Sequence, residues 1–297
     1  MTTVNILNVR PQDKNHAIFV SAGDRQTFAT YALENLRDTF DILIFQYGSK
    51  ELEHHQKMGA RLLAQGTGSK FNALKEIFRN RPDVFSHYET IWVCDDDLIR
   101  ENGDYRILPN VLAALGAQIV SPAHSLKGKI SHEIMLPVLG RHFFRFTSFV
   151  EMTCPVFSSK ALQKFLEQYD GSLSGYGDDW WYLNVIGANE HNVVGVVDTV
   201  TVINPADRQK MMGYSEAELL GDREQLRLRW LAAKERHGLH QWPTRTLAYV
   251  NPHQLTSMPS DIGAKLFRRR FKDDLRTSIS ALNHAVRCYK LRNRHAR

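Results

Sequence analysis

Short apolar runs alternate with stretches of helical spacing along the first part of the chain. The runs at 16–21, 41–46 and 90–94 are rich in β-branched and aromatic residues and predict buried strands. Between them, Phe28–Asp38 and Lys70–Asn80 are predicted to be helices. Strands that alternate with helices form a mostly parallel sheet, which binds its ligand outside the carboxyl ends of the strands.

The alternation continues further along the chain. Helices are predicted at Pro109–Leu115, from Ser158 or Ser159 to Tyr169, and from Asp178 to Ile186, and strands at Gln118–Ser121 and Val193–Val202. The Ser215–Glu218 capping box opens a further helical segment that ends near Gly238. Residues 242–261 contain three prolines and are predicted to form a linker or wrapping loop, and an amphipathic helix is expected beyond it.

Three consecutive aspartates follow the apolar run at 90–94. In an extended chain, Asp95 and Asp97 point to one side and Asp96 points to the other. Two carboxylates on one side repel each other unless a cation lies between them, and a hard divalent ion with oxygen ligands meets that need. The alternative is a solvated turn or the start of a helix. We expect Asp95 and Asp97 to bind Mn²⁺ or Mg²⁺.

A second acidic pair, Asp178 and Asp179, lies in the stretch 174–181, which reads Ser-Gly-Tyr-Gly-Asp-Asp-Trp-Trp. Acidic residues are favoured at the start of a helix by the helix dipole, and this is the structural explanation of the pair. The neighbouring glycines and aromatic residues instead favour an active-site loop.

The stretch 66–70, Gly-Thr-Gly-Ser-Lys, superficially suggests a phosphate-binding loop. It lacks the adjacent Gly-Lys pair followed by Ser or Thr that a P-loop requires. Backbone N–H groups at Gly68 and Ser69 could still bind a phosphate at the start of the helix, with Lys70 as a nearby charge. The alternative is an ordinary helix start with an exposed lysine.

Composition and charge limit the classes of protein to be considered. The 297 residues are 43% hydrophobic and 24% charged, as in an ordinary globular protein. Residues 263–297 hold eleven Lys and Arg against two Asp, whereas the other 262 residues carry three more acidic than basic side chains. The body of the chain therefore has no basic excess that would indicate a nucleic-acid-binding protein, and none is expected.

The cysteines and the apolar runs bear on localisation. Three cysteines lie far apart, without metal-ligand spacing, and are interpreted as reduced thiols. The N-terminus has no signal-peptide pattern, and no run reaches the roughly 18 apolar residues of a spanning helix. We expect a cytoplasmic protein. The basic segment 263–297 could hold it at an anionic inner membrane face, although a solvated oligomerisation helix is an equal alternative.

Six short motifs occur in the order found in metal-dependent GT-A glycosyltransferases. They are Phe19–Asp24, Gly68–Phe71, Trp92–Leu98, Phe149–Met152, Cys154–Ser158 and Ser174–Asp179. The chain resembles this class over residues 16–205, and more narrowly the glycosyltransferase-like family catalogued as domain of unknown function 707. The resemblance implies an α/β, GT-A-like (Rossmann-like) fold with a mixed, mostly parallel sheet flanked by helices. The helical pattern after residue 205 adds a helical C-terminal extension.

The chain is expected to divide into three parts, of which only the first takes part in the resemblance, because residues 206–297 contribute nothing to it. Residues 1–205 would be the nucleotide-sugar-binding and catalytic domain, 206–262 a helical and Pro-containing wrapping segment, and 263–297 a basic amphipathic helix. The partners would be a nucleotide-sugar donor and a glycan or lipid-linked acceptor.

Roles for individual residues follow from the resemblance. Asp95 and Asp97 would be the Asp-x-Asp metal site, and Asp179 matches the aspartate of the Gly-x-Asp motif. Relatives tend to have a His after the last strand, where this chain has Asn204, which would offer a metal only a carbonyl oxygen. The expected donor-binding residues are Ser21, Ala22, Gly23, Asp24, Tyr47, Lys70 and Asp96. Tyr176, Trp180 and Trp181 are expected to stack on an acceptor sugar, with a core position for the two tryptophans as the alternative.

Sugar transfer needs a base for the acceptor hydroxyl and a counter-charge for the leaving diphosphate. Asp179 is the first candidate for the base, with Asp178 and Glu151 as alternatives. Three rival functions use the same residues. A glycoside hydrolase would use Glu151 with Asp178 or Asp179 and needs no nucleotide. A nucleotidyltransferase would release pyrophosphate, and a catalytically inactive glycan-binding protein would bind without turnover.

Overall fold

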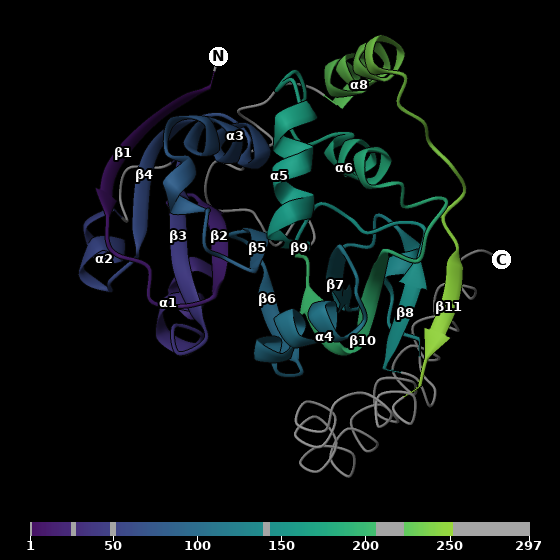
Figure 1. Cartoon of the computed structure of the whole chain (residues 1–297), viewed down its shortest axis with the longest axis horizontal. Helices are drawn as coiled ribbons and strands as arrows, with labels where there is room; N and C mark the ends of the chain where they lie inside the picture. The colour runs from purple at the N-terminus through teal and green to yellow at the C-terminus, as the bar shows by residue number, and fades with distance from the viewer. Residues whose placement is uncertain (1, 25–27, 48–51, 139–142, 206–222, 252–297) are drawn as a thin grey trace, which may run out of the picture.

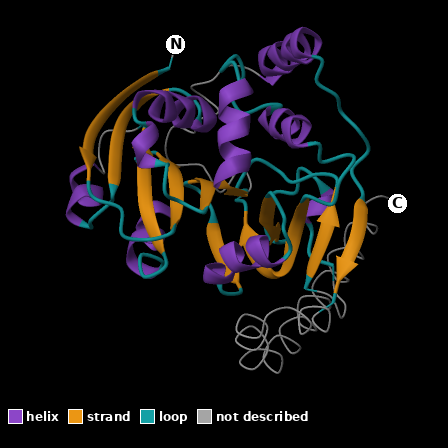
Figure 2. Ribbon diagram, in the orientation of Figure 1, coloured by secondary structure: helices purple, strands orange, loops and turns teal. Residues whose placement is uncertain are grey.

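A computed structural model of the chain describes residues 2–24, 28–47, 52–138, 143–205 and 223–251. Within these ranges the chain forms one mixed sheet of eleven strands with helices on both faces (Figures 1 and 2). The predicted helix at 263–297, the capping box at 215–218 and the loop residues 48–49 and 252–261 lie outside the described residues.

The order of strands across the sheet differs from their order along the chain. From one edge to the other, the strands are β1 (Thr3–Val9), β4 (Leu62–Thr67), β3 (Phe40–Gln46), β2 (His16–Ala22), β5 (Thr90–Asp95), β9 (Val156–Ser158), β7 (Ile119–His124), β10 (Val194–Ile203), β8 (Phe144–Thr147) and β11 (Thr246–Val250). Strand β6 (Ile99–Asn102) pairs with β10 beside this path.

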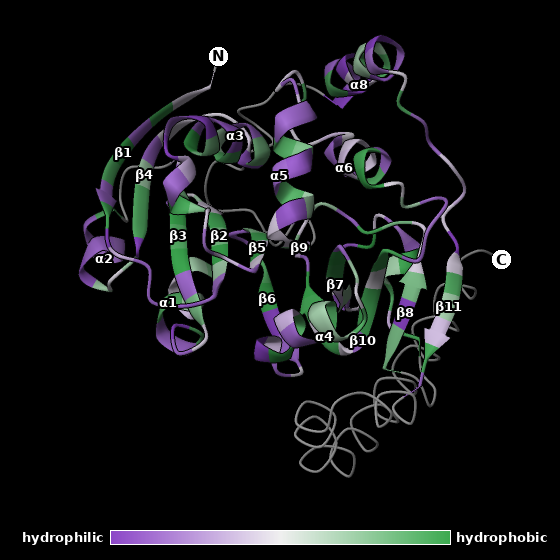
Figure 3. Ribbon diagram, viewed as in Figure 1, coloured by the Kyte–Doolittle hydropathy of each residue, from purple (hydrophilic) through white to green (hydrophobic). Residues whose placement is uncertain are grey.

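Alternate residues of the strands face two separate cores. Along β2, Ala17 and Phe19 belong to one core, whereas Ile18 and Val20 belong to the other. Figure 3 shows the hydrophobic residues along β2 and β3. The first core is covered by α3 (Lys70–Asn80), α5 (Ser159–Gln168), α6 (Asp178–Ile186) and α8 (Arg223–His237), and the second by α1 (Phe28–Asn35) and α4 (Leu108–Ala114). The short helices are α2 (Leu52–Lys57), η1 (Pro82–Val84), η2 (Tyr105–Ile107) and η3 (Glu133–Met135).

Seven of the strands run in the same direction: six in the interior of the sheet, and the edge strand β11, which is antiparallel to β8 as β8 is to β10. Strands β4, β3, β2 and β5 are joined by parallel pairing, and β7 pairs with β10 in the same way. Strand β9 is antiparallel to both β5 and β7, so these two blocks share one direction. The predicted mixed, mostly parallel sheet flanked by helices is confirmed. The carboxyl ends of the six interior strands form a shared rim at Thr67, Gln46, Ala22, Asp95, His124 and Ile203.

Several strands were not predicted from the sequence. Strand β1 is an edge strand whose exposed polar residues hide the alternation of Val4 and Ile6. Strand β11 lies within the segment 242–261 that was predicted to be a loop, and it pairs antiparallel with β8. None of the helices in the described ranges is long and apolar enough to cross a membrane.

Candidate functional site

The acidic triplet lies where β5 ends. Asp95 is the last residue of the strand and is in register with Ser21 of β2, at the shared rim of carboxyl ends. Asp96 and Asp97 form a turn, so the alternation expected of an extended chain stops at Asp95. The Asp95 side chain is 28% exposed, and its Oδ1 accepts a hydrogen bond from Lys70 Nζ at 2.6 Å.

Asp96 points into the protein and holds the loop after β2. Its Oδ2 accepts hydrogen bonds from the Gly23 backbone N–H at 2.5 Å and from the Tyr47 hydroxyl at 3.1 Å. Burial raises the pKa of Asp96 to about 7, against the effect of these donors. Three of the predicted donor-binding residues, Asp96, Gly23 and Tyr47, therefore lie together. The Asp96 carboxyl holds the loop after β2 in place through its hydrogen bond with the Gly23 N–H.

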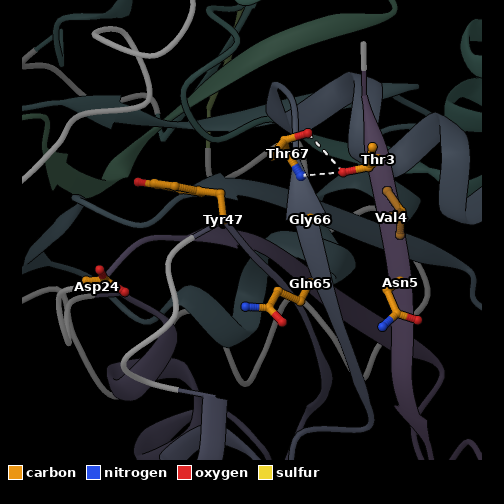
Figure 4. A pocket seen from close by; sticks show the side chains of 8 residues that line it. All are labelled: Thr3, Val4, Asn5, Asp24, Tyr47, Gln65, Gly66 and Thr67. Atoms are coloured by element: carbon orange, nitrogen blue, oxygen red, sulfur yellow. Dashed lines mark hydrogen bonds between the residues drawn. The ribbon is translucent and has the colours of Figure 1, made fainter.

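A pocket of about 580 Å³ opens beside this loop (Figure 4). Strands β1 and β4 form one wall, and the two predicted donor-binding residues Asp24 and Tyr47 lie on the other side. Asp24 is exposed, whereas Ser21 and Ala22 are buried within the end of β2. The lining residues are Thr3, Val4, Asn5, Asp24, Tyr47, Gln65, Gly66 and Thr67.

The second acidic pair opens α6, as predicted. Asp178 is fully buried, and its Oδ2 accepts a hydrogen bond from the Gly175 backbone N–H at 3.0 Å, which fastens the preceding loop. Asp179 is 7% exposed, and its Oδ1 accepts from the Trp180 N–H at 2.8 Å. Burial raises the pKa of Asp178 to about 6 and that of Asp179 to about 8.

Glu151 lies in the loop between β8 and β9, and the loop runs beside β5. The Asp95 N–H donates to the Thr153 carbonyl at 3.0 Å, which brings this loop next to the acidic triplet. Glu151 is 6% exposed, and its Oε1 accepts from the Thr153 hydroxyl at 3.1 Å. The nearby Glu151 charge contributes to the raised pKa of Asp179, after burial and against the Trp180 N–H. The three predicted catalytic carboxylates are therefore brought together by the fold.

A buried histidine at the end of β7 completes this group, and the sequence analysis missed it. His124 Nδ1 lies 3.4 Å from Glu151 Oε2, and its Nε2 lies 3.8 Å from Cys154 Sγ. Burial disfavours the charged form of both side chains. It is outweighed at His124 by contacts with Cys154 and Glu151, which raise the pKa of the histidine, and at Glu151 mainly by the contact with His124, which lowers the pKa of the carboxyl. Only the Pro-containing run Ser121-Pro122-Ala123-His124 after a strand start could have drawn attention to His124.

The predicted acceptor-binding aromatic residues differ in exposure. Tyr176 is 38% exposed, on the loop before α6. Trp181 is 1% exposed and packs on Tyr169 with ring centroids 5.1 Å apart, which matches the core alternative for this residue. Trp180 is 8% exposed and packs on Phe149 at 4.9 Å. Among the three, Tyr176 offers its ring to a ligand at the surface.

Asn204 lies just past β10 and is 8% exposed. Its backbone carbonyl accepts a hydrogen bond from the Lys129 N–H at 2.7 Å, and Gly128 packs so closely that a Cβ there would lie 2.3 Å from the same oxygen. The backbone of Asn204 therefore packs against the loop after β7 and is hydrogen-bonded to it. A ligand would meet the side-chain amide of Asn204.

Within the described residues, no group of three or more His, Cys, Asp and Glu is arranged to hold a metal ion. The chemistry of the rim fits a site with fewer protein ligands: Asp95 and Asp97 are partly exposed carboxylates, the hard oxygen donors that Mg²⁺ and Mn²⁺ prefer. Mg²⁺ in particular is commonly held by one or two carboxylates together with substrate phosphates.

The comparisons with known proteins bear on the fold. The structure of Staphylococcus aureus TarS 1-349 in complex with UDP-GlcNAc superposes with a TM-score of 0.50 at 11% sequence identity, covering 76% of this chain and 68% of that one. This chain has the fold of TarS, a GT-A-like glycosyltransferase.

Two other solved structures are less similar. The structure of S. aureus TarS 1-349 in complex with UDP superposes with a TM-score of 0.43 at 10% sequence identity, covering 74% of this chain and 72% of that one. The structure of A197 from STIV superposes with a TM-score of 0.36 at 11% sequence identity, covering 63% of this chain and 83% of that one. No family model and no curated protein matches the chain, so the narrower resemblance to domain of unknown function 707 stays a prediction.

The loop before α6 is covered by α8, an interaction that the sequence did not predict. Trp230 of α8 is 1% exposed and lies against Gly177, the residue before α6. Arg229 donates to the Ser174 hydroxyl at 2.9 Å, and His237 Nε2 lies 2.8 Å from Asp170 Oδ2. Helix α8 therefore fixes the segment that positions Asp178 and Asp179.

Substituting Gly177→Ala should destabilise the protein by about 3 kcal/mol, at the upper end for a single substitution. Gly177 has a φ of 93°, and an added Cβ would lie 2.5 Å from the Trp230 ring. Gly116→Ala is the matched control, because Gly116 has a φ of 61° but no atom within 4 Å of the added Cβ. The control should lose only about 1 kcal/mol, the cost of placing an alanine in the left-handed conformation. Equal losses in urea unfolding would show that the contact with Trp230 does not constrain the loop.

Proposed function

We propose that the protein is a glycosyltransferase that moves a sugar from a nucleotide-sugar donor to a glycan or lipid-linked acceptor. The observation that carries the proposal is the position of the pocket. It opens at the carboxyl rim of a GT-A-like sheet, lined by Asp24 and Tyr47, and Tyr47 donates to Asp96 of the acidic triplet. Ligands of open α/β sheets bind at this rim, and the TarS structure of the same fold contains UDP-GlcNAc.

Asp95 and Asp97 are proposed to hold Mn²⁺ or Mg²⁺ together with the donor diphosphate. When bound, the ion would neutralise the charge that develops on the leaving phosphate. The chain's own contribution is to present these two carboxylates at and just after the end of β5, while the half-buried Asp96 fixes the loop at Gly23. Asn204 is retained as a candidate ligand through its side-chain amide.

Asp179 is proposed to accept the proton of the acceptor hydroxyl. It lies at the start of α6 within a buried group of acids, and its pKa of about 8 is close to the operating range of a general base. Asp178 is less suited, because one of its oxygens fastens Gly175. Glu151 remains the alternative base, because its contact with His124 keeps it ionised.

The pH dependence of turnover distinguishes Asp179 from Glu151. A base must be deprotonated to act, so turnover that depends on Asp179 should rise with pH and level off above about pH 8. The pKa of Glu151 is lowered, so a Glu151 base would give turnover that is already level at neutral pH. Initial rates at saturating donor between pH 5.5 and 9.5 measure the difference, and a flat profile from pH 5.5 to 9.5 would reject Asp179.

The proposed function is tested with a panel of nucleotide sugars in the presence of Mn²⁺, scored first by thermal shift and then by release of the nucleoside phosphate or diphosphate. One donor should raise the melting temperature and be turned over with a suitable acceptor. Binding without turnover would favour a glycan-binding protein that retains the fold. Release of pyrophosphate would identify a nucleotidyltransferase.

A glycoside hydrolase is the second candidate, and a specific observation supports it. The environments of Glu151 and Asp179 push their pKa values apart, so that one is ionised and the other protonated near neutral pH. Such a pair is the arrangement of an acid and a base in sugar hydrolysis. A hydrolase needs no nucleotide, so a titration with UDP and GDP that shows no binding, together with hydrolysis of an aryl glycoside, would favour it.

A further inference from the structure

The side chain of Lys70 is buried beneath the acidic triplet. It begins α3 and is 1% exposed. Its ammonium donates to Asp95 Oδ1 at 2.6 Å, to the Met152 carbonyl at 2.6 Å and to the Thr153 carbonyl at 3.3 Å. These acceptors come from the end of β5 and from the loop before β9, two segments far apart in the sequence.

Lys70 also acts on a second acid through its charge. Its charge favours the ionised form of Asp178, the buried residue that opens α6. The ammonium therefore lies among groups from three parts of the site: the acidic triplet, the loop of Glu151 and the start of α6. A buried ammonium is expensive unless it is paired and hydrogen-bonded, so these contacts hold one another in place.

We propose that Lys70 is a positioning residue, which acts through Asp95 and through the loop at Met152 and Thr153 and does not contact the donor. The proposal rests on the proposed function, because it explains how the donor-binding carboxylate of Asp95 and the loop that carries Glu151 keep their relative positions. It replaces the expectation that Lys70 is a point charge for the donor phosphate. An ammonium that is 1% exposed does not reach a ligand bound at the surface of the rim.

The geometry also determines how Asp95 meets a ligand. The hydrogen bond from Lys70 to Oδ1 fixes the orientation in which the Asp95 carboxylate faces the rim. The same ammonium donates to the backbone carbonyls of Met152 and Thr153. The Thr153 hydroxyl in turn donates to the Glu151 carboxylate. Loss of Lys70 should therefore disturb nucleotide binding through Asp95 and turnover through Glu151 and its neighbours.

A double-mutant cycle with Lys70→Met, Asp95→Asn and the double variant tests the proposal on the full chain. Two quantities are measured: the dissociation constants of UDP and of GDP with Mn²⁺, and the free energy of unfolding without any ligand. Each single substitution should weaken nucleotide binding by about 10- to 100-fold, the range for partners that orient a metal ligand. The double variant should bind no more weakly than Asp95→Asn alone, because Lys70 acts through Asp95.

Lys75→Met is the matched control. Lys75 lies on the same helix and donates to the Tyr169 carbonyl, away from the triplet. Its loss should affect unfolding but leave the nucleotide dissociation constants unchanged. An equal loss of binding in this control would show that any disturbance of α3 has the same effect, and would overturn the positioning role.

The outcomes separate the positioning role from the proposed function. If the losses in nucleotide binding are independent, so that the double variant shows their product, Lys70 contacts the nucleotide itself and the proposal is wrong. If the unfolding free energies of the Lys70→Met and Asp95→Asn substitutions are additive in the double variant, the ion pair between Lys70 and Asp95 does not stabilise the protein and the proposal is also wrong. If the wild-type chain binds neither diphosphate although unfolding is coupled, the proposed function fails, and the role of Lys70 in donor binding fails with it.

Discussion

Replacing Asp179 with Asn should lower turnover by about 10²- to 10⁴-fold, the usual contribution of a general base, and leave donor binding unchanged. The amide keeps the size of the side chain and can still accept the hydrogen bond that the Trp180 N–H donates to Oδ1 at 2.8 Å. It cannot take a proton from the acceptor. The measurement is kcat and donor Kd for the wild type and the variant at pH 8.5, where the wild-type carboxyl is largely ionised.

The pH dependence of the stability of the Asp179→Asn variant provides an independent check that the pKa of Asp179 is raised in the folded protein. The pKa of Asp179 is raised in the folded protein, so the folded state binds more protons than the unfolded state between about pH 4 and pH 8. The stability contributed by this group is therefore present at low pH and lost as the pH rises through about 8. A neutral amide should remove this part of the pH dependence.

Asp83→Asn is the control for Asp179→Asn. Asp83 also lies in the first turn of a helix, η1, but it is exposed and pairs with Arg81. Its substitution should leave kcat unchanged. Wild-type turnover in Asp179→Asn would reject this residue as the base and leave Glu151 as the candidate.

The second large effect is expected at Asp97. The variant Asp97→Ala should weaken binding of UDP or GDP with Mn²⁺ by at least about 100-fold, because even groups that only orient a metal ligand contribute 10- to 100-fold. Asp97 lies in the turn after β5, beside Asp95 at the carboxyl rim. Removing one of two carboxylates leaves the ion with a single charged protein ligand. Calorimetric titration with and without Mn²⁺ measures the loss.

The matched control for Asp97→Ala is Asp13→Ala, which removes an exposed aspartate paired with Lys14. Nucleotide binding should be unchanged in the control. If Asp97→Ala binds the nucleotide as tightly as the wild type, Asp97 is not part of the metal site. If the wild type binds equally well with and without Mn²⁺, no metal is needed for binding and the assignment of both carboxylates is wrong.

Helices and buried strands were predicted best where the pattern was strong. The sequence predicted α3 at Lys70–Asn80 and α6 at Asp178–Ile186 with the bounds found in the structure. It missed β1 and β11, because edge strands bury few residues and their pattern is weak. Ser158 caps α5 by accepting from the Ala161 N–H, one of the two caps expected.

For the candidate site, the sequence identified carboxylates but not what surrounds them. Asp95, Glu151 and Asp179 were all singled out from their local motifs. Their convergence depends on the loop before β9 running beside β5, a contact between residues about sixty positions apart. His124 was missed, because the one unusual feature near it is Pro122, and a proline in a strand does not indicate a functional histidine.

By itself, the sequence determined the α/β class, the main strands and the positions of the acids at strand and helix ends, because these follow from local periodicity and from the chemistry of each side chain. Only the tertiary structure decided which acids lie together and in which state. It buried Lys70 against Asp95, ionised Glu151 beside His124 and raised the pKa of Asp179. These properties arise from desolvation and from charges brought close by distant segments, and no local pattern encodes them.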